Sequence, residues 1–287
     1  MTPARIVLLV AAFVVASSCA EAGPVPPGGG GGGVQRYEAD ATVLDAGSGP
    51  ELCLGAVADS LPPQCGGPPI LGWSWSEVDG EESVSGVTWG TFHVTGTFDG
   101  TSFTVEEVGP PPPPAGPDGD PFRTPCPEPS GGWVDVDASK TGEADRLATM
   151  RVAERSEEFA GLWIDSLGPV DELDPPPFVL NVAFTGDPAT YEDDLRAVWG
   201  GPLCVLRFDH GYRDLRRIQR ELGDGGAEAL GLELLWSSVD VMTNRVEIGT
   251  IVIDDDGRAA LDAAYGRGVV RVVPALRPVG EPSPTAS

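Results

Sequence analysis

A proline-rich stretch near the middle of the chain most constrains its fold. Residues 109–132 read GPPPPPAGPDGDPFRTPCPEPSGG. Proline lacks a backbone N–H donor and fixes φ, so a run this dense favours extended polyproline II over helix or sheet. We therefore predict a linker at 109–132 that separates two folded domains, one at 37–108 and one at 133–277, in a chain of 287 residues.

The first domain is predicted to be all-β. Threonine, valine and aromatic residues alternate at period two from Val87 to Val108, and Asp99-Gly100 occupies the place of a tight hairpin turn. Asp79-Gly80 indicates a second hairpin. Short strands joined in this way form a small antiparallel β-barrel or sandwich, of which an OB-like barrel is one arrangement.

The second domain changes to a helical period, which predicts an α+β fold. A weak internal repeat, LRAVWGG at 195–201 and LDAAYGR at 261–267, has a predicted strand on each side. It predicts two β-α-β units in an α+β sandwich of the split β-α-β kind, with extra helices between the halves. The expected strands are 178–184, 203–208, 246–253 and 269–273, and the expected helices are 143–159, 188–199, 212–222, 226–236 and 257–265.

The first nineteen residues are typical of a lipoprotein signal. Arg5 precedes an uncharged run from Ile6 to Ala16, and two serines stand before Cys19. This run is too short to cross a bilayer, which needs about 20 residues. We predict that residues 1–18 are a signal peptide and that Cys19 carries the lipid, with acyl chains such as palmitate, on the extracytoplasmic face of the cell membrane. A plain secreted protein with an incidental cysteine is the alternative.

The two ends of the mature chain are predicted to lack regular structure. Residues 19–36 contain GPVPPGGGGGGV, which is typical of a flexible tether. Residues 278–287 are rich in proline, serine and threonine and are predicted to be a disordered tail.

The remaining cysteines are even in number, as suits an oxidising compartment. Their spacing favours one short-range disulfide and leaves the other two thiols for each other, whereas a buried free thiol at Cys204 is the alternative. Close CxxC spacing is absent and the chain has two histidines, so a zinc site is not expected. The expected disulfides are Cys53–Cys65 and Cys126–Cys204.

The chain is strongly acidic. It carries 44 Asp and Glu residues against 18 Lys and Arg, for a formal net charge of −26, and Lys140 is the one lysine. Such a surface repels nucleic-acid phosphates and anionic lipid headgroups. We expect no nucleic-acid partner, and we expect membrane attachment to depend on the lipid anchor. Either a GC-rich genome or adaptation to high salt would explain the excess of Asp and Glu and the replacement of lysine by arginine, and the charge does not separate the two.

Other polar motifs have simple structural interpretations. His93 alternates with threonines on a predicted strand and is expected to face solvent, and His210 is expected in a strand-to-helix turn. The run 254–257, DDDG, lacks the ligand spacing of a calcium loop, so Asp256 is predicted to cap a helix. The run 118–120, DGD, is predicted to be a turn. We therefore expect no catalytic residue, metal or cofactor.

Three tryptophans are candidate binding residues. Trp73 and Trp75 lie two apart on a predicted strand, and Trp89 is expected beside them. They can fill the barrel core. Alternatively, they form an exposed aromatic platform for sugar or peptidoglycan.

The predicted helix 212–222 concentrates positive charge. Arginines surround its apolar stripe in an otherwise acidic chain. They form either a solvated face that pairs with Asp214 and Glu221 or a surface that docks onto an acidic domain or partner. The candidate binding residues are Arg213, Arg216, Arg217 and Arg220.

Two resemblances to known families accompany these patterns. Segments 51–75, ELCLGAVADSLPPQCGGPPILGWSW, and 86–100, GVTWGTFHVTGTFDG, resemble a domain of actinobacterial exported lipoproteins whose function is not established. FAGLWID at 159–165, FVLNVAFTGD at 178–187 and SVDVMTNRVEIG at 238–249 resemble propeptide segments of streptogrisin-type secreted proteases. Those propeptides assist folding of an attached protease and inhibit it, whereas this sequence contains neither GDSGG nor GxSxG, so the resemblance implies a fold only.

The sequence predicts a lipid-anchored extracytoplasmic binding or interaction module of the cell envelope, without a catalytic site. Its expected partner is an envelope protein or a cell-wall ligand. Two alternatives remain open: a chaperone- or inhibitor-like protein that acts on a secreted protease, and a hydrolase that uses scattered carboxylates.

Overall fold

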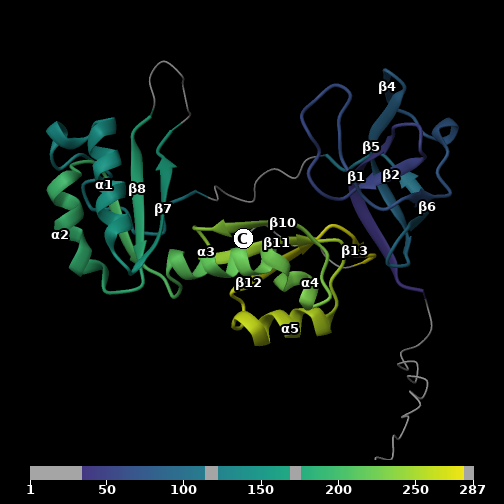
Figure 1. Ribbon diagram of the computed structural model, residues 1–287. Coiled ribbons are helices and arrows are strands. Elements are labelled where there is room, and N and C mark those ends of the chain that lie inside the picture. The colour runs from purple at the N-terminus through teal and green to yellow at the C-terminus, as the bar shows by residue number, and fades with distance from the viewer. Residues whose placement is uncertain (1–33, 114–121, 169–175, 281–287) are drawn as a thin grey trace, which may run out of the picture. The chain divides into compact units, whose positions relative to one another are not determined.

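The computed structural model describes residues 34–113, 122–168 and 176–280, which form an α+β fold with three β-sheets (Figure 1). The predicted signal peptide, the lipidation residue Cys19 and most of the tether lie outside the described residues. The run 118–120 and most of the predicted tail also lie outside them. Every described helix is too short or too polar to cross a membrane.

The first sheet is barrel-like and contains seven described strands. Its hydrogen-bonded path runs β13-β1-β5-β6-β3, with β2 paired to β1 and β4 paired to β5. A short 3-10 helix, η1 (Trp75–Glu77), interrupts the strands. The strands are β1 (Arg36–Asp45), β2 (Pro50–Cys53), β3 (Ile70–Leu71), β4 (Glu82–Val84), β5 (Val87–Phe98), β6 (Phe103–Gly109) and β13 (Arg277–Pro278).

Residues at period two along the central strands form the core of this sheet. Val43 on β1 and Phe92 and Val94 on β5 belong to one buried apolar cluster, which confirms the predicted alternation. His93 lies on the opposite face of β5, where its Nδ1 is 2.7 Å from Oδ1 of Asp40 on β1. The outward orientation predicted for His93 is thus confirmed.

One of the two predicted hairpins is present. Asp99-Gly100 joins β5 to β6, with φ of +94° at the glycine, as a tight turn requires. The hairpin predicted at Asp79-Gly80 is wrong. The chain instead reverses at Ser85-Gly86 between β4 and β5, where φ is +55° and +82°, the geometry of a two-residue type I′ turn.

The rest of the chain contains two units with the same order of elements: helix, strand, strand, helix, strand. In each unit the first two strands are antiparallel, and the second helix leads to a third strand that is parallel to the second. The first unit consists of α1 (Glu143–Arg155), β7 (Phe159–Ser166), β8 (Phe178–Phe184), α2 (Pro188–Val198) and β9 (Leu203–Arg207). The second consists of α3 (Tyr212–Glu221), β10 (Leu234–Asp240), β11 (Arg245–Thr250), α5 (Asp255–Tyr265) and β12 (Val270–Pro274).

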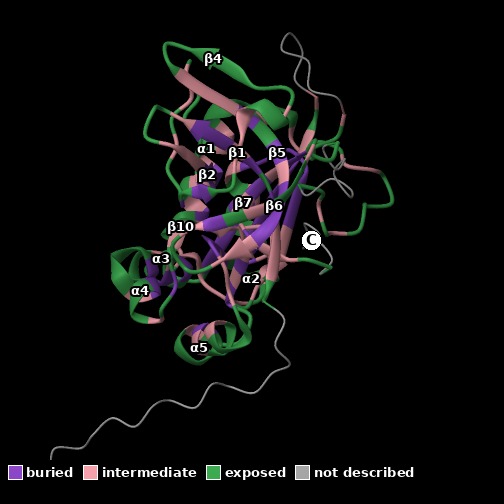
Figure 2. Cartoon of the chain, turned by 90° about the vertical axis from the view of Figure 1, so that its right-hand side faces the viewer, coloured by how far each residue is buried: buried purple, intermediate pink, exposed green. Residues whose placement is uncertain are grey.

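The two predicted β-α-β units are confirmed as β8-α2-β9 and β11-α5-β12. The repeated leucines, Leu195 on α2 and Leu261 on α5, are both almost fully buried. The units do not share one sandwich, however, because each three-stranded sheet has its own apolar cluster beneath its own helices. Figure 2 shows the buried residues mainly along the strands and exposed residues on the outer faces of the helices.

The helix predicted at 226–236 is wrong over most of its length. After α3 come a kinked segment, η3 (Leu222–Gly226), in which Asp224 and Gly225 leave the helical conformation, and the short α4 (Ala227–Ala229), and β10 begins at Leu234. Gly231 has φ of +75°, which stops the helix despite the helix-forming residues around it. The cap of α5 also differs from the prediction, since Asp254 rather than Asp256 accepts a hydrogen bond from Gly257 N.

The end of the described chain returns to the barrel-like sheet. Leu276, which is fully buried, and Ile251 belong to the apolar cluster of that sheet. Pro278 is paired with Tyr37 of β1, so ordered strand structure reaches into the region expected to be a tail. Burial of Leu276 and an available edge of β1 explain this extension.

Part of the predicted linker is held against the first unit. The indole Nε1 of Trp163 donates to Phe122 O over 3.1 Å, and Thr124 N donates to Oδ2 of Asp165 over 2.7 Å. Thr124 Oγ1 also donates to Oδ1 of Asn181 over 2.6 Å. Asp165 and Asn181 are buried, so water does not reach them, and these bonds give their polar atoms hydrogen-bond partners. We call residues 122–126 the strap.

Both predicted disulfides are confirmed. Cys53 pairs with Cys65 with a Cα–Cα distance of 5.7 Å, and Cys126 pairs with Cys204 with a Cα–Cα distance of 5.8 Å. The second bond fastens the end of the strap to β9. It also closes a sequence separation of 78 residues, against 12 for the first.

Replacing both Cys126 and Cys204 by alanine should lower the free energy of unfolding by about 2–4 kcal/mol, because the unfolded chain regains the entropy of a long loop. Urea unfolding of the oxidised proteins measures this change. The matched double alanine variant at Cys53 and Cys65 should lose less, since its loop is shorter. Equal stability of wild type and the Cys126/Cys204 variant would show that the strap is not fastened in solution.

Candidate functional site

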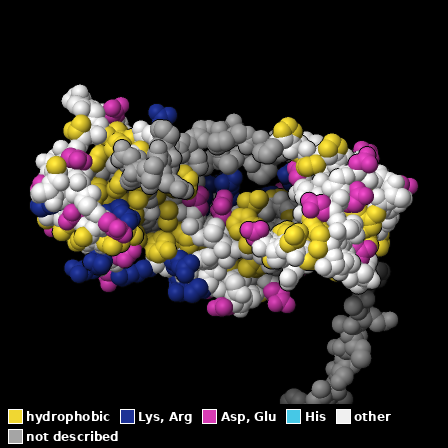
Figure 3. All heavy atoms as spheres, turned by 90° about the horizontal axis from the view of Figure 1, so that it is seen from above, with side chains coloured by type: hydrophobic (Ala, Val, Ile, Leu, Met, Phe, Trp, Pro, Cys, Tyr) yellow, Lys and Arg dark blue, Asp and Glu magenta, His cyan; other side chains and the backbone are white. Residues whose placement is uncertain are grey.

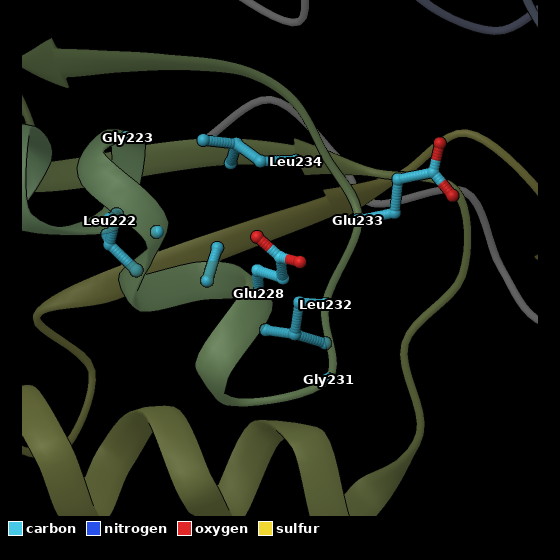
Figure 4. A pocket seen from close by; sticks show the side chains of 9 residues that line it. Leu222, Gly223, Glu228, Gly231, Leu232, Glu233 and Leu234 are labelled. Carbon is cyan, nitrogen blue, oxygen red and sulfur yellow. The ribbon is translucent and has the colours of Figure 1, made fainter.

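One hollow, with a volume of about 580 Å³, lies beside α4. Leucines and glycine backbone form most of its wall. In Figure 4 the carboxylate of Glu228 lies among the side chains of Leu222, Leu232 and Leu234, whereas Glu233 points away. The two glutamates therefore do not face each other as the acid and base of a hydrolase do.

Two other hollows also lack a convergent set of like charges. One, of about 520 Å³, lies between α1 and α2 and has an apolar wall that includes Phe184 and Leu195. The other, of about 470 Å³, lies beside the strap and combines Arg123 with Glu128 and Asp165. Neither arrangement selects a ligand by charge.

A smaller hollow, of about 270 Å³, has the most distinctive chemistry. Three of its residues are arginines, accompanied by His210, and Asp209 is its one carboxylate. None of the three guanidinium groups forms an ion pair or hydrogen bond with a described residue. We call this hollow the arginine pocket, and its lining is Arg207, Phe208, Asp209, His210, Thr243, Asn244, Arg245, Arg267 and Gly268.

The arginine pocket lies at the joint between the two α+β units. Arg207 is the last residue of β9 in the first unit, and Arg245 is the first residue of β11 in the second. Arg267 lies in the turn between α5 and β12. Val246 N donates to Val269 O over 2.9 Å, and this bond holds that turn beside the start of β11.

A buried asparagine fixes the two sides of the pocket. Asn244 is 5% exposed and has φ of +55°, a left-handed conformation that asparagine tolerates better than most residues. Its Oδ1 accepts from His210 N over 2.8 Å, and its Nδ2 donates to His210 O over 2.7 Å. We call this pair of bonds the amide clamp. It joins the β10–β11 hairpin to the loop between β9 and α3.

Apolar packing supports the amide clamp. Val241 and Met242, at the tip of the same hairpin, pack against a small cluster on the three-stranded sheet of the first unit that includes Trp163. Phe208 stacks on Trp163 with 6.1 Å between ring centroids. A Cβ at Gly161 would lie 3.1 Å from Cβ of Val241, so a larger residue would displace the hairpin tip. The wall of the arginine pocket is therefore built on a packed interface.

The segment beside the pocket has a net positive charge, whereas the whole chain has a net negative charge. Residues 207–220 contain five arginines and two aspartates, whereas the chain has a formal net charge of −26. Figure 3 shows Lys and Arg side chains gathered along one edge of the face in view, while Asp and Glu are scattered over it. A local excess of unpaired guanidinium groups favours an anionic ligand.

The arginine helix predicted from the sequence is α3. Arg217 forms ion pairs with Asp214 and Glu221, and the hydrogen bond that it donates to Glu221 raises the Arg217 pKa. Arg216 donates to Gln219, while the other two arginines have no hydrogen-bond or ion-pair partner among the described residues. All four predicted arginines are exposed: Arg213, Arg216, Arg217 and Arg220.

The structure does not bring the three candidate tryptophans together. Trp73 and Trp75 pack on Phe92 of the barrel core, with centroid distances of 5.0 and 6.3 Å. Trp75 begins η1, so the expected strand through both tryptophans is wrong. Trp89 is three residues before Phe92 on β5 and therefore lies on the opposite, outward face. Core packing accounts for Trp73 and Trp75.

The sequence analysis missed the arginine pocket. His210 does lie in the predicted strand-to-helix turn, but Arg207, Arg245 and Arg267 are far apart in the sequence. Arg207 ends one strand, Arg245 begins another and Arg267 lies in the turn before a third, so the sequence holds no local signal that brings them together. Among the described residues, no cluster of three His, Cys, Asp or Glu side chains has the geometry to hold a metal ion.

Comparison with models of known protein families gives no match to the chain, and a search of curated proteins gives none. The functional argument therefore rests on the geometry and charge of the site.

Replacing Asn244 by glycine should lower the free energy of unfolding by about 1–3 kcal/mol, because the backbone N–H and C=O of His210 lose their partners. Glycine adopts the required positive φ without strain, so this variant isolates the loss of the amide clamp. Alanine at the same position should lose about 1 kcal/mol more, since it also resists that conformation. Chemical denaturation measures both variants. Wild-type stability of Asn244→Gly would contradict a structural role for the clamp.

Proposed function

We propose that this protein is a lipid-anchored extracytoplasmic binding module and that the arginine pocket binds an anionic group of its ligand. Two disulfides support an oxidising, extracytoplasmic location. The N-terminal sequence supports attachment through Cys19. The sequence alone did not indicate a chemical class of ligand, and the arginines of the pocket favour an anion.

One observation carries the proposal: three arginines from both α+β units, none paired with a described residue, line one hollow in a chain of charge −26. Like charges held together cost free energy unless an anion or solvent compensates them. Arginine presents its donors in a planar fork that matches the oxygens of phosphate and carboxylate groups. The charge and donor geometry therefore suit an oxyanion better than a cation or an apolar molecule.

Titration calorimetry with inorganic phosphate at about 0.1 M salt tests the pocket. The Debye length is then about 10 Å, so distant carboxylates are screened while groups inside the pocket are not. Arg245→Gln should weaken phosphate binding by at least about tenfold, because a hydrogen bond to a charged group is worth roughly 1.5–3 kcal/mol and 1.4 kcal/mol is a factor of ten. Arg207→Gln and Arg267→Gln should act in the same direction.

The matched control is Arg151→Gln on α1. Arg151 is exposed and has no hydrogen-bond or ion-pair partner among the described residues, but it lies outside the arginine pocket. It removes the same charge from the chain, so phosphate affinity should be retained. Absence of phosphate binding by the wild type, or equal losses in the control and the pocket variants, would refute an anion site here.

The lipid anchor is tested separately by Cys19→Ser in a bacterial host that processes lipoproteins. The variant should not incorporate labelled palmitate and should leave the membrane fraction or accumulate as a precursor, because the thiol that accepts the lipid is absent. Fractionation and metabolic labelling measure this outcome. A processed variant that stays in the membrane fraction would contradict the lipoprotein assignment.

A further inference from the structure

The arginine pocket and α3 are adjacent along the chain. His210 lines the pocket, and α3 begins two residues later at Tyr212. At about 100° per residue, the four arginines of α3 fall within an arc of about 100°. Leu215 and Ile218, both buried, lie on the opposite side of the helix. We call the row of Arg213, Arg216, Arg217 and Arg220 the arginine ridge.

The ridge is long enough to contact more than one charged group. Ten helical residues extend about 15 Å. Arg213, in the first turn, and Arg220, in the last, are the two ridge arginines without a described hydrogen-bond or ion-pair partner. The two middle arginines are already held by neighbours on α3. Each end of the ridge therefore has a guanidinium group that no described residue pairs with.

Such an exposed row is of little use to a single small anion. An exposed ion pair contributes only about 0–1 kcal/mol, so no ridge arginine alone would retain an ion. A ligand that carries several anions on one chain differs, because each further contact is intramolecular and each releases counterions from the ligand. A pocket for one oxyanion followed by a row of weak cationic contacts thus matches a linear polyanion.

We infer that the protein binds an extended, phosphate-bearing polyanion, with one phosphate in the arginine pocket and the following phosphates along the arginine ridge. This inference rests on the proposed function of the pocket. Phosphate fits the pocket better than a single carboxylate, because three guanidinium groups can surround its tetrahedral oxygens and balance its greater charge. A second copy of this acidic chain is the competing occupant, which the experiment must exclude.

The experiment compares pyrophosphate with inorganic polyphosphate of about 20 phosphates, using titration calorimetry of the mature disulfide-bonded protein without its lipid, with metal chelators present. After division by its roughly 19 overlapping binding registers, the affinity of the polymer should still be at least tenfold higher than that of pyrophosphate, because the polymer reaches the ridge as well as the pocket. The double variant Arg213→Gln/Arg220→Gln should lose about three- to tenfold in polymer affinity and keep its pyrophosphate affinity. Loss of two phosphate contacts should also reduce the slope of log affinity against log salt by about 1.4.

The control variant, Arg151→Gln/Arg258→Gln, removes two exposed arginines that likewise lack a described hydrogen-bond or ion-pair partner and lie outside the pocket and ridge. It should bind both probes as the wild type does.

If the polymer binds no more tightly than pyrophosphate, or the control loses as much polymer affinity as the ridge variant, the inference fails while the pocket stands. If neither probe binds, the proposed pocket function fails. If the ridge variant changes self-association by sedimentation but not polymer binding, the ridge serves a second copy and the inference is overturned.

Discussion

The arrangement of the second half of this protein depends on one buried amide. Asn244 bonds both backbone polar groups of His210 and so joins two units that each have their own sheet, helices and apolar cluster. Arg207 belongs to one unit, and Arg245 and Arg267 belong to the other. Neither unit alone contains the arginine pocket. A change in the amide clamp would therefore move the binding groups relative to one another.

The strap performs a comparable role on the first unit. Asp165 and Asn181 are polar residues inside a sheet, where their desolvation would destabilise the fold if they had no partners. Thr124 provides partners for both, and the Cys126–Cys204 bond fastens the strap where it meets β9. A segment whose proline content indicates a linker is thus a covalently fastened part of the unit.

Local patterns in the sequence predicted those parts of the fold that local patterns determine. The period-two alternation of β5, the glycine turn at Asp99-Gly100 and the repeated leucines at 195 and 261 all specify structure within a few residues. The prediction failed at 226–236, where Ala, Glu and Leu favour a helix. There Gly231 stops the helix, and pairing of β10 with β11 determines the strand. Pairing between distant segments leaves only a weak local signal.

The binding groups were harder to predict for the same reason. The four arginines of α3 are close in sequence, so their clustering was evident. The number of arginines in the helix does not show, however, that Arg216 and Arg217 form hydrogen bonds or ion pairs with neighbours on α3. Arg207, Arg245 and Arg267 converge only because β9 ends, β11 begins and the α5–β12 turn lies at one joint. That convergence is a property of the tertiary fold rather than of any sequence window.

Net charge alone suggests that this protein should repel phosphate, yet the pocket and ridge are basic. The two statements are compatible because dissolved salt screens distant charges more strongly than charges in direct contact with the ligand. At physiological salt the Debye length is about 8 Å, so a carboxylate on a distant surface contributes little to the potential inside a hollow lined by three guanidinium groups. The acidic remainder still acts at longer range and at lower salt, where it opposes the approach of any polyanion. Binding should then be strongest at an intermediate ionic strength, high enough to screen the chain as a whole and low enough to preserve the contacts of the pocket.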